Sequence, residues 1–476
     1  MLVRDSLSGR EVEVGKDGKV GLYVCGPTVY NHIHIGNARA PLFWDVVARY
    51  LRSRGYEVTL VQNITDIDDK IIIKANEEGV SWEEIVHRYT DSFHELLALL
   101  GVDLPDVEPR ATEHIPEMIS LVQELIDKDH AYAPGNGDVY YRVESYPLYG
   151  QLSKQRPDEM RETEKGAGDY KESPLDFALW KASKPGEPSW ESPWGPGRPG
   201  WHIECSAMVE KHLPGGADIH GGGTDLRFPH HENELAQSAG AHPDRTFVRA
   251  WAHHGMVNLA SGKMAKSLGN ILDVERAIEL HGKNAIRMWF LQSHYSQPID
   301  YSEEILEEKG RSYERLRNLY TQIGDSTSSS ELSDNLATKL NERFDAAMRD
   351  DFDTPRALAA IFEAAGRVGQ EVSARPTAAK EFLSFKDTLA ELLFTFRFTL
   401  PVWSEVRLIW HDDGPSPVVR VKDNLELGER VREKIVRREQ ARREKNWAVA
   451  DQLRNELYAE GWLIEDAPEG PIVSRR

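Results

Sequence analysis

The stretch GLYVCGPTVYNHIHIGNARAPLFWDVVARYLRSRGYEVTLVQN, residues 21–63, indicates the fold class of this chain. Its first eight residues predict a short buried strand that enters a Gly-Pro turn, and residues 37–50 carry apolar side chains at helical spacing. Residues 57–63 predict a second strand. This order is typical of a doubly wound α/β nucleotide-binding domain, whose ligands lie at the carboxyl ends of the strands. Cys25 lies at such an end.

Outward from this stretch, an insertion interrupts the α/β pattern. We expect the first half of a Rossmann-like domain over residues 1–130. Residues 131–200 contain a β-like stretch, DVYYRV, and a loop rich in Pro, Gly and Trp, so we interpret them as an insertion.

The second half of the nucleotide-binding fold is expected over residues 201–260. We predict a strand at 217–220, a glycine turn at 221–223 and a helix that begins near His230. Glycines in such a turn let the backbone approach a ligand closely, although a tight turn alone explains them too.

The C-terminal part has the pattern of an all-α bundle followed by a small domain. After a Lys-containing loop and a helical segment in 261–323, a polar run forms a linker, and residues 331–400 show bundle-like helical spacing. Residues 401–476 form the last domain, in which the start, 401–424, has no clear pattern and the rest is expected to be helical to about Glu460.

Composition and charge restrict the class of protein. With 40% hydrophobic and 29% charged residues, and no apolar run near the length of a membrane span, the 476-residue chain is expected to be a cytoplasmic protein without a membrane anchor. Its two cysteines argue against a disulfide framework. The net charge of −20 argues against non-specific coating of nucleic acid, but Arg and Lys outnumber Glu by eight to three between residues 430 and 445.

A possible metal site includes both cysteines. In FPHHENE, His230 and Glu234 are four residues apart and would share a helix face, whereas His231 has Leu235 at that offset, so we expect only His230 to pair with a carboxylate. Adding Cys25 and Cys205 gives a Cys₂-His-Glu set of ligand types that zinc uses. Two inert thiols and a surface His–Glu pair would explain the same residues.

Two further motifs suit phosphate chemistry. His34-Ile35-Gly36-Asn37 falls in the turn between the first strand and its helix, where backbone N–H groups favour phosphate. GKMAKSLGN, residues 262–270, supplies Lys263 and Lys266 and could stabilise charge on a transferring phosphoryl group. Alone, the first motif is short enough to arise by chance and the second is equally a solvated lysine loop.

Taken together, HIGN, KMAKS, CGPTVY, NITDIDDKI, GWHIECSAM and HGGGTDLRFPHHENE resemble the class I aminoacyl-tRNA synthetases, and among them the cysteinyl-tRNA synthetase family. The resemblance covers about residues 20 to 320 and continues more weakly through 350–362 and 437–457. Two positions depart from the family signatures: HIGH ends in Asn37, and KMSKS has Ala265 in third place. Neither change removes the lysine that contacts ATP in that family, which here is Lys266.

The resemblance implies activation of L-cysteine with ATP and Mg²⁺, followed by transfer to tRNA(Cys), by a monomer. It implies one zinc ion per chain that reads the substrate thiol, an anticodon-binding domain at 401–476, and a stem-contact region within 261–323. The implied residues are as follows: zinc ligands Cys25, Cys205, His230 and Glu234; catalytic His34, Asn37, Lys263 and Lys266; ATP-binding His34, Gly36, Asn37 and Lys266; amino-acid pocket Thr65, Trp201 and Asp225.

Two other functions compete with this one. A related ligase transfers the same adenylate to a small amino sugar, but such enzymes lack the tail that is present here at 350–460. A catalytically inactive zinc- and RNA-binding protein could also retain the scaffold, although Lys266, His34 and the four candidate ligands are all intact. Trp201 is equally compatible with an ordinary core position, and the basic tail with a helix that carries Glu–Arg pairs.

Overall fold

The fold is described from a computed structural model of the chain. It describes residues 1–156, 160, 170–259, 262–263, 274–324, 326–400, 403–407, 418–422, 427–466 and 471–475. The chain divides into two compact units, Met1–Phe398 and Thr399–Arg476. Each unit is treated by itself below.

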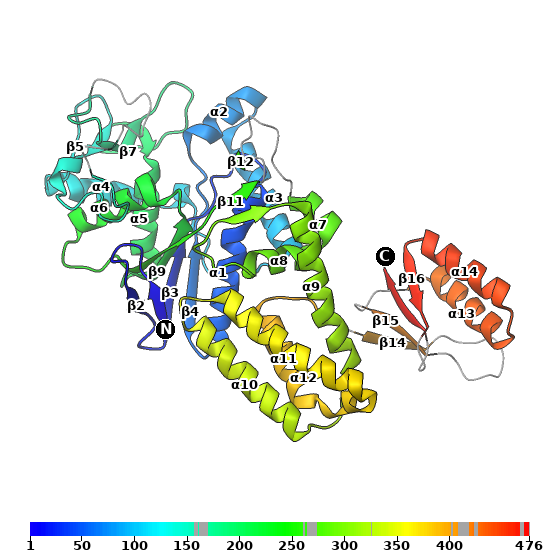
Figure 1. Cartoon of the computed structure of the whole chain (residues 1–476). Coiled ribbons are helices and arrows are strands. Elements are labelled where there is room, and N and C mark those ends of the chain that lie inside the picture. The colour runs from blue at the N-terminus through cyan, green and yellow to red at the C-terminus, as the bar shows by residue number, and fades with distance from the viewer. Residues whose placement is uncertain are drawn as a thin grey trace. The chain divides into compact units, whose positions relative to one another are not determined.

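A four-stranded parallel sheet forms the centre of the first unit (Figure 1). Its strands are β3 (Lys19–Val24), β4 (Glu57–Gln62), β9 (Ala217–Gly223) and β10 (Val248–His254), in the order β10-β9-β3-β4. Helix α1 (Ile35–Ser53) connects β3 to β4 and buries one face through apolar residues that include Leu42, Val46 and Val47. The predicted strand–loop–helix–strand order, and with it the Rossmann-like fold class, is confirmed.

The inserted segment is an antiparallel sheet of four strands in the order β5-β6-β7-β8. Its strands are β5 (Ala131–Tyr132), β6 (Val139–Tyr141), β7 (Phe177–Ala182) and β8 (Gly197–Pro199). One apolar core joins it to three helices: α4 (Ile115–Asp127), α5 (Trp201–His212) and α6 (Glu232–Ala241). Helices α5 and α6, which carry candidate ligands, are therefore held by the core that they share with the insertion.

The three glycines after Ile219 belong to strand β9 and do not form the predicted turn. A β-carbon on Gly221 would collide with the indole ring of Trp44, and one on Gly222 would lie 2.6 Å from Cε1 of His231. Glycine is required here because side chains from other elements pack directly on the strand, not because the chain reverses direction. The error in the sequence interpretation is that a Gly-rich run was assumed to be a turn.

The rest of the first unit comprises a small sheet and several helices. Strands β11 (Val257–Leu259), β12 (Gly262–Lys263) and β13 (Ile299–Tyr301) form a sheet in the order β12-β11-β13. The remaining elements are β1 (Leu2–Arg4), β2 (Glu11–Glu13), α2 (Asp69–Glu78), α3 (Trp82–Leu100), α7 (Val274–His281), α8 (Lys283–Leu291), α9 (Glu303–Gln322), α10 (Glu331–Met348), α11 (Thr354–Ala374) and α12 (Leu383–Thr395).

The bundle helices begin at local sequence signals. The side chain of Ser330 caps α10 by accepting from the N–H of Ser333, and that of Asp353 caps α11, which has Pro355 in its first turn. Asp345 of α10 accepts hydrogen bonds from Tyr50 (2.6 Å) and Arg54 (2.9 Å), which lie at the C-terminal end of α1. The bundle is therefore joined to the nucleotide-binding fold through α1.

The second unit is an α/β domain (Figure 1). Its sheet has the order β14-β15-β17-β16 and is formed by β14 (Trp403–Arg407), β15 (Val418–Lys422), β16 (Trp462–Glu465) and β17 (Ile472–Arg475). Helices α13 (Glu429–Arg443) and α14 (Trp447–Ala459) accompany this sheet. Two strands come from the region 401–424, for which the sequence predicted no element. Within the described part of the whole chain, no helix has the length and apolarity needed to cross a membrane.

Candidate metal centre and nucleotide site

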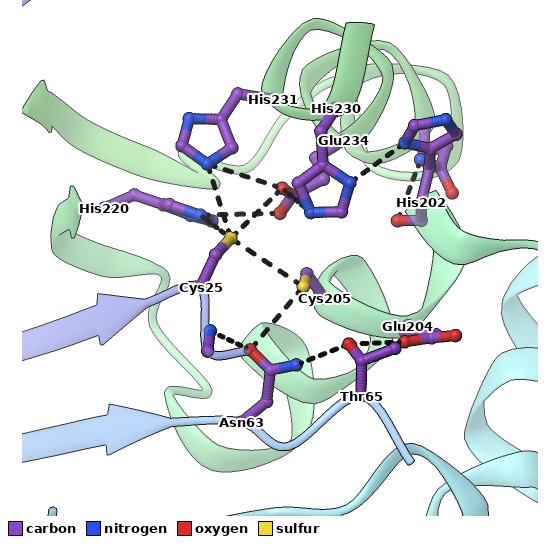
Figure 2. Close-up of polar contacts among 12 residues, drawn as sticks. Cys25, Asn63, Thr65, His202, Glu204, Cys205, His220, His230, His231 and Glu234 are labelled. Atoms are coloured by element: carbon purple, nitrogen blue, oxygen red, sulfur yellow. Dashed lines mark hydrogen bonds and ion pairs between the residues drawn. The ribbon is translucent and has the colours of Figure 1, made fainter. Parts of the chain in front are cut away.

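Four separate elements bring the predicted metal ligands together (Figure 2). Cys25 follows β3, Cys205 lies in α5, His230 lies in the irregular turn after β9, and Glu234 lies in the first turn of α6. The Cys25 and Cys205 sulfurs are 3.9 Å apart, Cys25 Sγ is 3.8 Å from Glu234 Oε1, and His230 Nε2 is 3.1 Å from the same oxygen. One donor atom from each of the four residues lies within 4.8 Å of the donor atoms of the other three.

The environment of this cluster favours a bound cation. Cys205, His230 and Glu234 are each at most 1% exposed, and Oε2 of Glu234 has no hydrogen-bond partner among the residues that the structure describes. Burial raises the pKa of Glu234 and of Cys25 well above their usual ranges, whereas the hydrogen bond from Cys25 lowers the pKa of Cys205. Buried acidic groups of this kind are costly unless a positive charge compensates them. Two thiols, an imidazole and a carboxylate are a donor set that suits Zn²⁺.

A second set of donors overlaps the first, and it includes His231. Nε2 of His231 lies 3.3 Å from Cys25 Sγ and 4.0 Å from Oε1 of Glu234, and Nε2 of His220 lies 3.4 Å from the same sulfur. The expectation that only His230 could meet a carboxylate is therefore wrong. His231 and Glu234 are three residues apart in helical backbone, and residues three apart also share a helix face.

Each histidine of the pair His230–His231 is backed by another histidine. Nδ1 of His230 lies 3.0 Å from Nδ1 of His202, and Nδ1 of His231 lies 2.9 Å from Nε2 of His253. Burial lowers the pKa of His202 and His231 well below the usual value, and that of His253 to about 3, so these rings are neutral at physiological pH. Such contacts at Nδ1 fix the ring orientation and tautomer and leave Nε2 to bind a metal.

His202, His220 and His253 were not identified from the sequence. The one usable signal was position, because β9 contains His220 and β10 contains His253, and ligands gather at the carboxyl ends of parallel strands. Isolated histidines in apolar segments are otherwise ordinary core residues.

A hydrogen-bonded row connects the metal cluster to the predicted amino-acid pocket. The amide oxygen of Asn63 accepts from the N–H of Gly26 at 3.0 Å, its amide nitrogen donates to Thr65 Oγ1 at 3.2 Å, and Thr65 donates to Glu204 at 3.1 Å. Gly26 permits this contact, since a β-carbon there would collide with the carbonyl oxygen of Asn63.

Of the other predicted pocket residues, one lies at the cluster and one lies at the surface. Trp201 stacks on His230 with ring centroids 4.3 Å apart, so it is part of the wall around the candidate ligands. Asp225 is exposed in the turn that follows β9.

The HIGN motif forms the N-terminal cap of α1. Nδ1 of His34 accepts from the N–H of Gly36 at 3.1 Å, and the side-chain oxygen of Asn37 accepts from the backbone N–H of His34 at 3.3 Å. In the neutral ring, the proton therefore resides on Nε2, and the ring lies at the beginning of the helix, where anions are favoured. The departure to Asn37 thus preserves a capping box.

The lysine motif is described only in part. Lys263 is the last residue of β12, and its backbone pairs with Asn258 of β11. Lys266 lies outside the described residues, as does the remainder of the KMAKS sequence.

Comparison with family models places most of the chain in known families. Residues 11–311 match the model for the tRNA synthetases class I (C) catalytic domain, and residues 343–396 match the DALR domain. The first match covers more than half of the chain.

Curated relatives align over nearly their whole lengths. A cysteine–tRNA ligase of Rubrobacter xylanophilus is 68% identical over 476 residues, which are 100% of this chain and 99% of the relative. A cysteine–tRNA ligase of Thermodesulfovibrio yellowstonii is 42% identical over 470 residues, 96% of this chain and 95% of the relative.

Solved structures share the fold at low sequence identity. Methionyl-tRNA synthetase of Mycobacterium tuberculosis, in complex with methionyl-adenylate, matches with a TM-score of 0.60 at 16% identity, covering 80% of this chain and 89% of that one. A putative arginyl-tRNA synthetase of Campylobacter jejuni matches with a TM-score of 0.53 at 12% identity, covering 79% and 92%. These likenesses concern the fold alone.

Proposed function

The chain belongs to the cysteine–tRNA ligase family of class I aminoacyl-tRNA synthetases, and from this premise we propose that its metal cluster selects the substrate thiol. The proposed ligands of one zinc ion per chain are Cys25, Cys205, His230 and Glu234. The proposal rests on one observation: the only two cysteines of the sequence lie together with a histidine and a glutamate in a buried cluster.

Two thiols decide between the overlapping donor sets. The set with Cys205 offers two sulfurs, and the set with His220 and His231 offers one. Zinc in a dry site favours thiolates, so the set that offers two sulfurs suits it better. His220 and His231 then serve as the wall of the site.

A zinc ion held there would supply a soft coordination position that suits a thiolate better than a hydroxyl. The protein's own residues would orient the substrate. Trp201 packs against the ligand His230, and the row Asn63–Thr65–Glu204 holds the Thr65 hydroxyl in a fixed direction. A hydrophobic pocket alone would separate cysteine from a near-isostere by only about 1–3 kcal/mol, so metal coordination is the stronger discriminator.

ATP would bind at the HIGN turn. His34, Gly36 and Asn37 lie at the N-terminus of α1, where Nε2 of His34 can donate to phosphate oxygens. Lys263 and Lys266 are assigned to the charge that develops on the leaving pyrophosphate, with Mg²⁺ bound to the nucleotide. The cysteine carboxylate attacks the α-phosphorus and pyrophosphate leaves, and the tRNA 3′ hydroxyl then attacks the carbonyl carbon of the cysteinyl-adenylate and releases AMP.

The tRNA is assigned to the C-terminal parts of the chain. We assign contact with the tRNA stem to residues 261–323 and anticodon recognition to residues 401–476. The helical bundle between them spans residues 331–400. The support is chemical: α13 exposes Arg437, and Trp447 of α14 is 56% exposed and lies under the guanidinium of Arg442. Exposed cations and aromatic rings suit phosphates and unstacked bases. We further propose a monomer that works in the cytoplasm.

Two assays in sequence test the function. Cysteine-dependent exchange of pyrophosphate into ATP is expected, followed by charging of tRNA(Cys). Absence of exchange would exclude both ligase functions, and exchange without charging would favour the small-acceptor ligase. Lys266→Ala should abolish exchange and leave the zinc content at one per chain.

A further inference from the structure

A buried arginine lies directly after the HIGN motif. Arg39 is in the second turn of α1, and its side chain is 1% exposed. Nη1 donates to the carbonyl oxygens of Gly255 (2.6 Å) and Gln297 (2.8 Å), and Nη2 donates to that of His294 (3.2 Å). One guanidinium thus gathers the backbones of two segments that are far from α1 in sequence.

Both segments lead into the small sheet that precedes the KMAKS motif. Gly255 lies two residues before β11, and Gln297 lies two residues before β13, with which β11 pairs in parallel. The third strand, β12, pairs with β11 and ends at Lys263, where the KMAKS motif begins. Arg39 therefore connects the helix of one signature motif to the base of the sheet that carries the other.

The packing at this junction is close. The N–H of Gly255 donates to Tyr295 at 2.8 Å, and the N–H of Ile299 donates to Met256 at 3.0 Å. A β-carbon on Gly255 would collide with the backbone of Gln297. Since the two segments touch directly, a shift of the carbonyl groups that Arg39 holds would move β11 and β13 together.

The buried charge of Arg39 indicates that this side chain does more than fill space in the core. Within the described part of the chain, the hydrogen-bond partners of its guanidinium are three carbonyl oxygens, and no ion pair joins it to a carboxylate. Burial lowers its pKa to about 10, so it remains a cation at neutral pH. A buried cation without an anion is costly to keep, and the planar guanidinium spreads its donors over two nitrogens, a geometry that the single ammonium nitrogen of lysine does not reproduce.

We propose that Arg39 is a positioning residue for cysteine activation, which fixes the separation between the HIGN turn and the sheet that leads into the KMAKS motif. The inference rests on the proposed binding of ATP between these two motifs. Misplacing reacting groups by about 1 Å can reduce a rate by about 100-fold, so a loosened junction should affect the ATP step in particular.

Arg287 provides a matched control. It is also fully buried on a helix of the same unit. It donates to the carbonyl oxygens of Phe396 (2.9 Å) and Leu100 (3.0 Å) and, unlike Arg39 among the described residues, it lies 3.7 Å from a carboxylate, that of Asp45 on α1. Arg39→Lys and Arg287→Lys therefore both replace a buried guanidinium that caps carbonyl groups. A purely structural role would give the two variants the same kinetic behaviour.

The experiment measures pyrophosphate exchange, zinc content and amide exchange on the full-length protein. For Arg39→Lys we expect kcat/KM for ATP to fall about 10- to 100-fold, with KM for cysteine and zinc content within twofold of wild type. Arg287→Lys should lower the melting temperature and leave kcat/KM for ATP within twofold. Amide hydrogens of 255–259 should exchange faster in the Arg39 variant alone.

Three outcomes would overturn the inference: unchanged ATP parameters in Arg39→Lys, equal losses in both variants, or unchanged amide exchange at 255–259. Arg39→Met is a harsher test, and should be worse than Arg39→Lys if the donors are what matters. If it does not fold, Arg39→Lys still decides. The Lys266→Ala variant separates the two proposals, because wild-type exchange there would refute the ATP assignment itself, whatever Arg39 does.

Discussion

The metal cluster and the HIGN turn start from the same connection between β3 and α1, yet they are built in opposite ways. Cys25 and His34 are nine residues apart (34 − 25). The cluster collects its donors from four elements and buries them, whereas the HIGN turn is one continuous segment that caps its own helix. A zinc ion that coordinates a substrate thiol needs several fixed ligands in a site without water. A phosphate can bind to the backbone N–H groups and the dipole at the N-terminus of one helix.

This contrast implies that the binding of cysteine and the binding of ATP can be lost separately. A change in the cluster should alter zinc content and the response to cysteine, and a change in the turn should alter the response to ATP. The four predictions below test that separation, beginning with the largest effect.

Removing a thiol from the cluster should have the largest effect. Cys205→Ser should reduce zinc from one per chain to nearly none and abolish cysteine activation together with discrimination against serine, because hydroxyl is a poor zinc ligand. Zinc is measured by mass spectrometry of the purified protein, and activation by pyrophosphate exchange. A variant with full zinc content and unchanged rejection of serine would refute the ligand assignment.

A change in the HIGN turn should reduce the rate and spare the metal. His34→Asn keeps a side-chain acceptor for the helix cap but removes the ring donor, so exchange should fall about 100-fold at unchanged zinc content. His34→Ala, which also loses the cap, should in addition lower the melting temperature. Loss of zinc in His34→Asn would show that the two sites are not independent.

The histidines behind the ligands should distinguish the two donor sets. His202→Leu removes the partner of His230 and should weaken zinc binding about 10- to 100-fold, measured by competition with a chelator. His253→Leu removes the partner of His231 and should change zinc affinity by less than threefold. The reverse order would indicate that the ion is held by His220 and His231.

The smallest effect concerns the scaffold that both sites share. Although burial alone would raise the pKa of Asp345, hydrogen bonds from Tyr50, Arg54 and Arg349 lower it below its ordinary value. This carboxylate therefore stabilises the fold above the unfolded-state pKa of about 4, and its contribution disappears as the pH falls through the lower folded-state pKa. Asp345→Asn should lower the free energy of unfolding by about 1–2 kcal/mol at pH 7 and by less near pH 3.

Urea titrations at the two pH values measure this difference. Glu363→Gln on α11 is the control, because that carboxylate is exposed and should matter little at either pH. A loss for Asp345→Asn that is equal at pH 7 and pH 3 would contradict the assigned role of its charge.

Sequence reasoning succeeded where the evidence was local or carried by several motifs together. The β3–α1–β4 order follows from the helical spacing of apolar residues over 37–50 between two short apolar stretches. The four candidate ligands were assembled from ligand chemistry and from the spacing of His230 and Glu234, and the family resemblance favoured them over inert thiols.

The errors arose where tertiary contacts outweigh local pattern. The glycines of β9 are explained by Trp44 and His231 packing on the strand, which the sequence of that segment does not contain. The error at His231 was local instead: residues three apart share a helix face as residues four apart do, and only the latter offset was considered. The sheet of the second unit joins short strands from both ends of the domain, and neither end has a strong periodicity.

Gly26 places a constraint on inheritance as well as on shape. Every missense change of a glycine codon adds a β-carbon, and at this position that atom would meet the carbonyl oxygen of Asn63. The collision would separate the ends of β3 and β4 and move Cys25, the neighbouring residue, out of reach of its partners. Because every replacement at this codon adds the colliding atom, we expect any natural variant with a substitution at Gly26 to lose function.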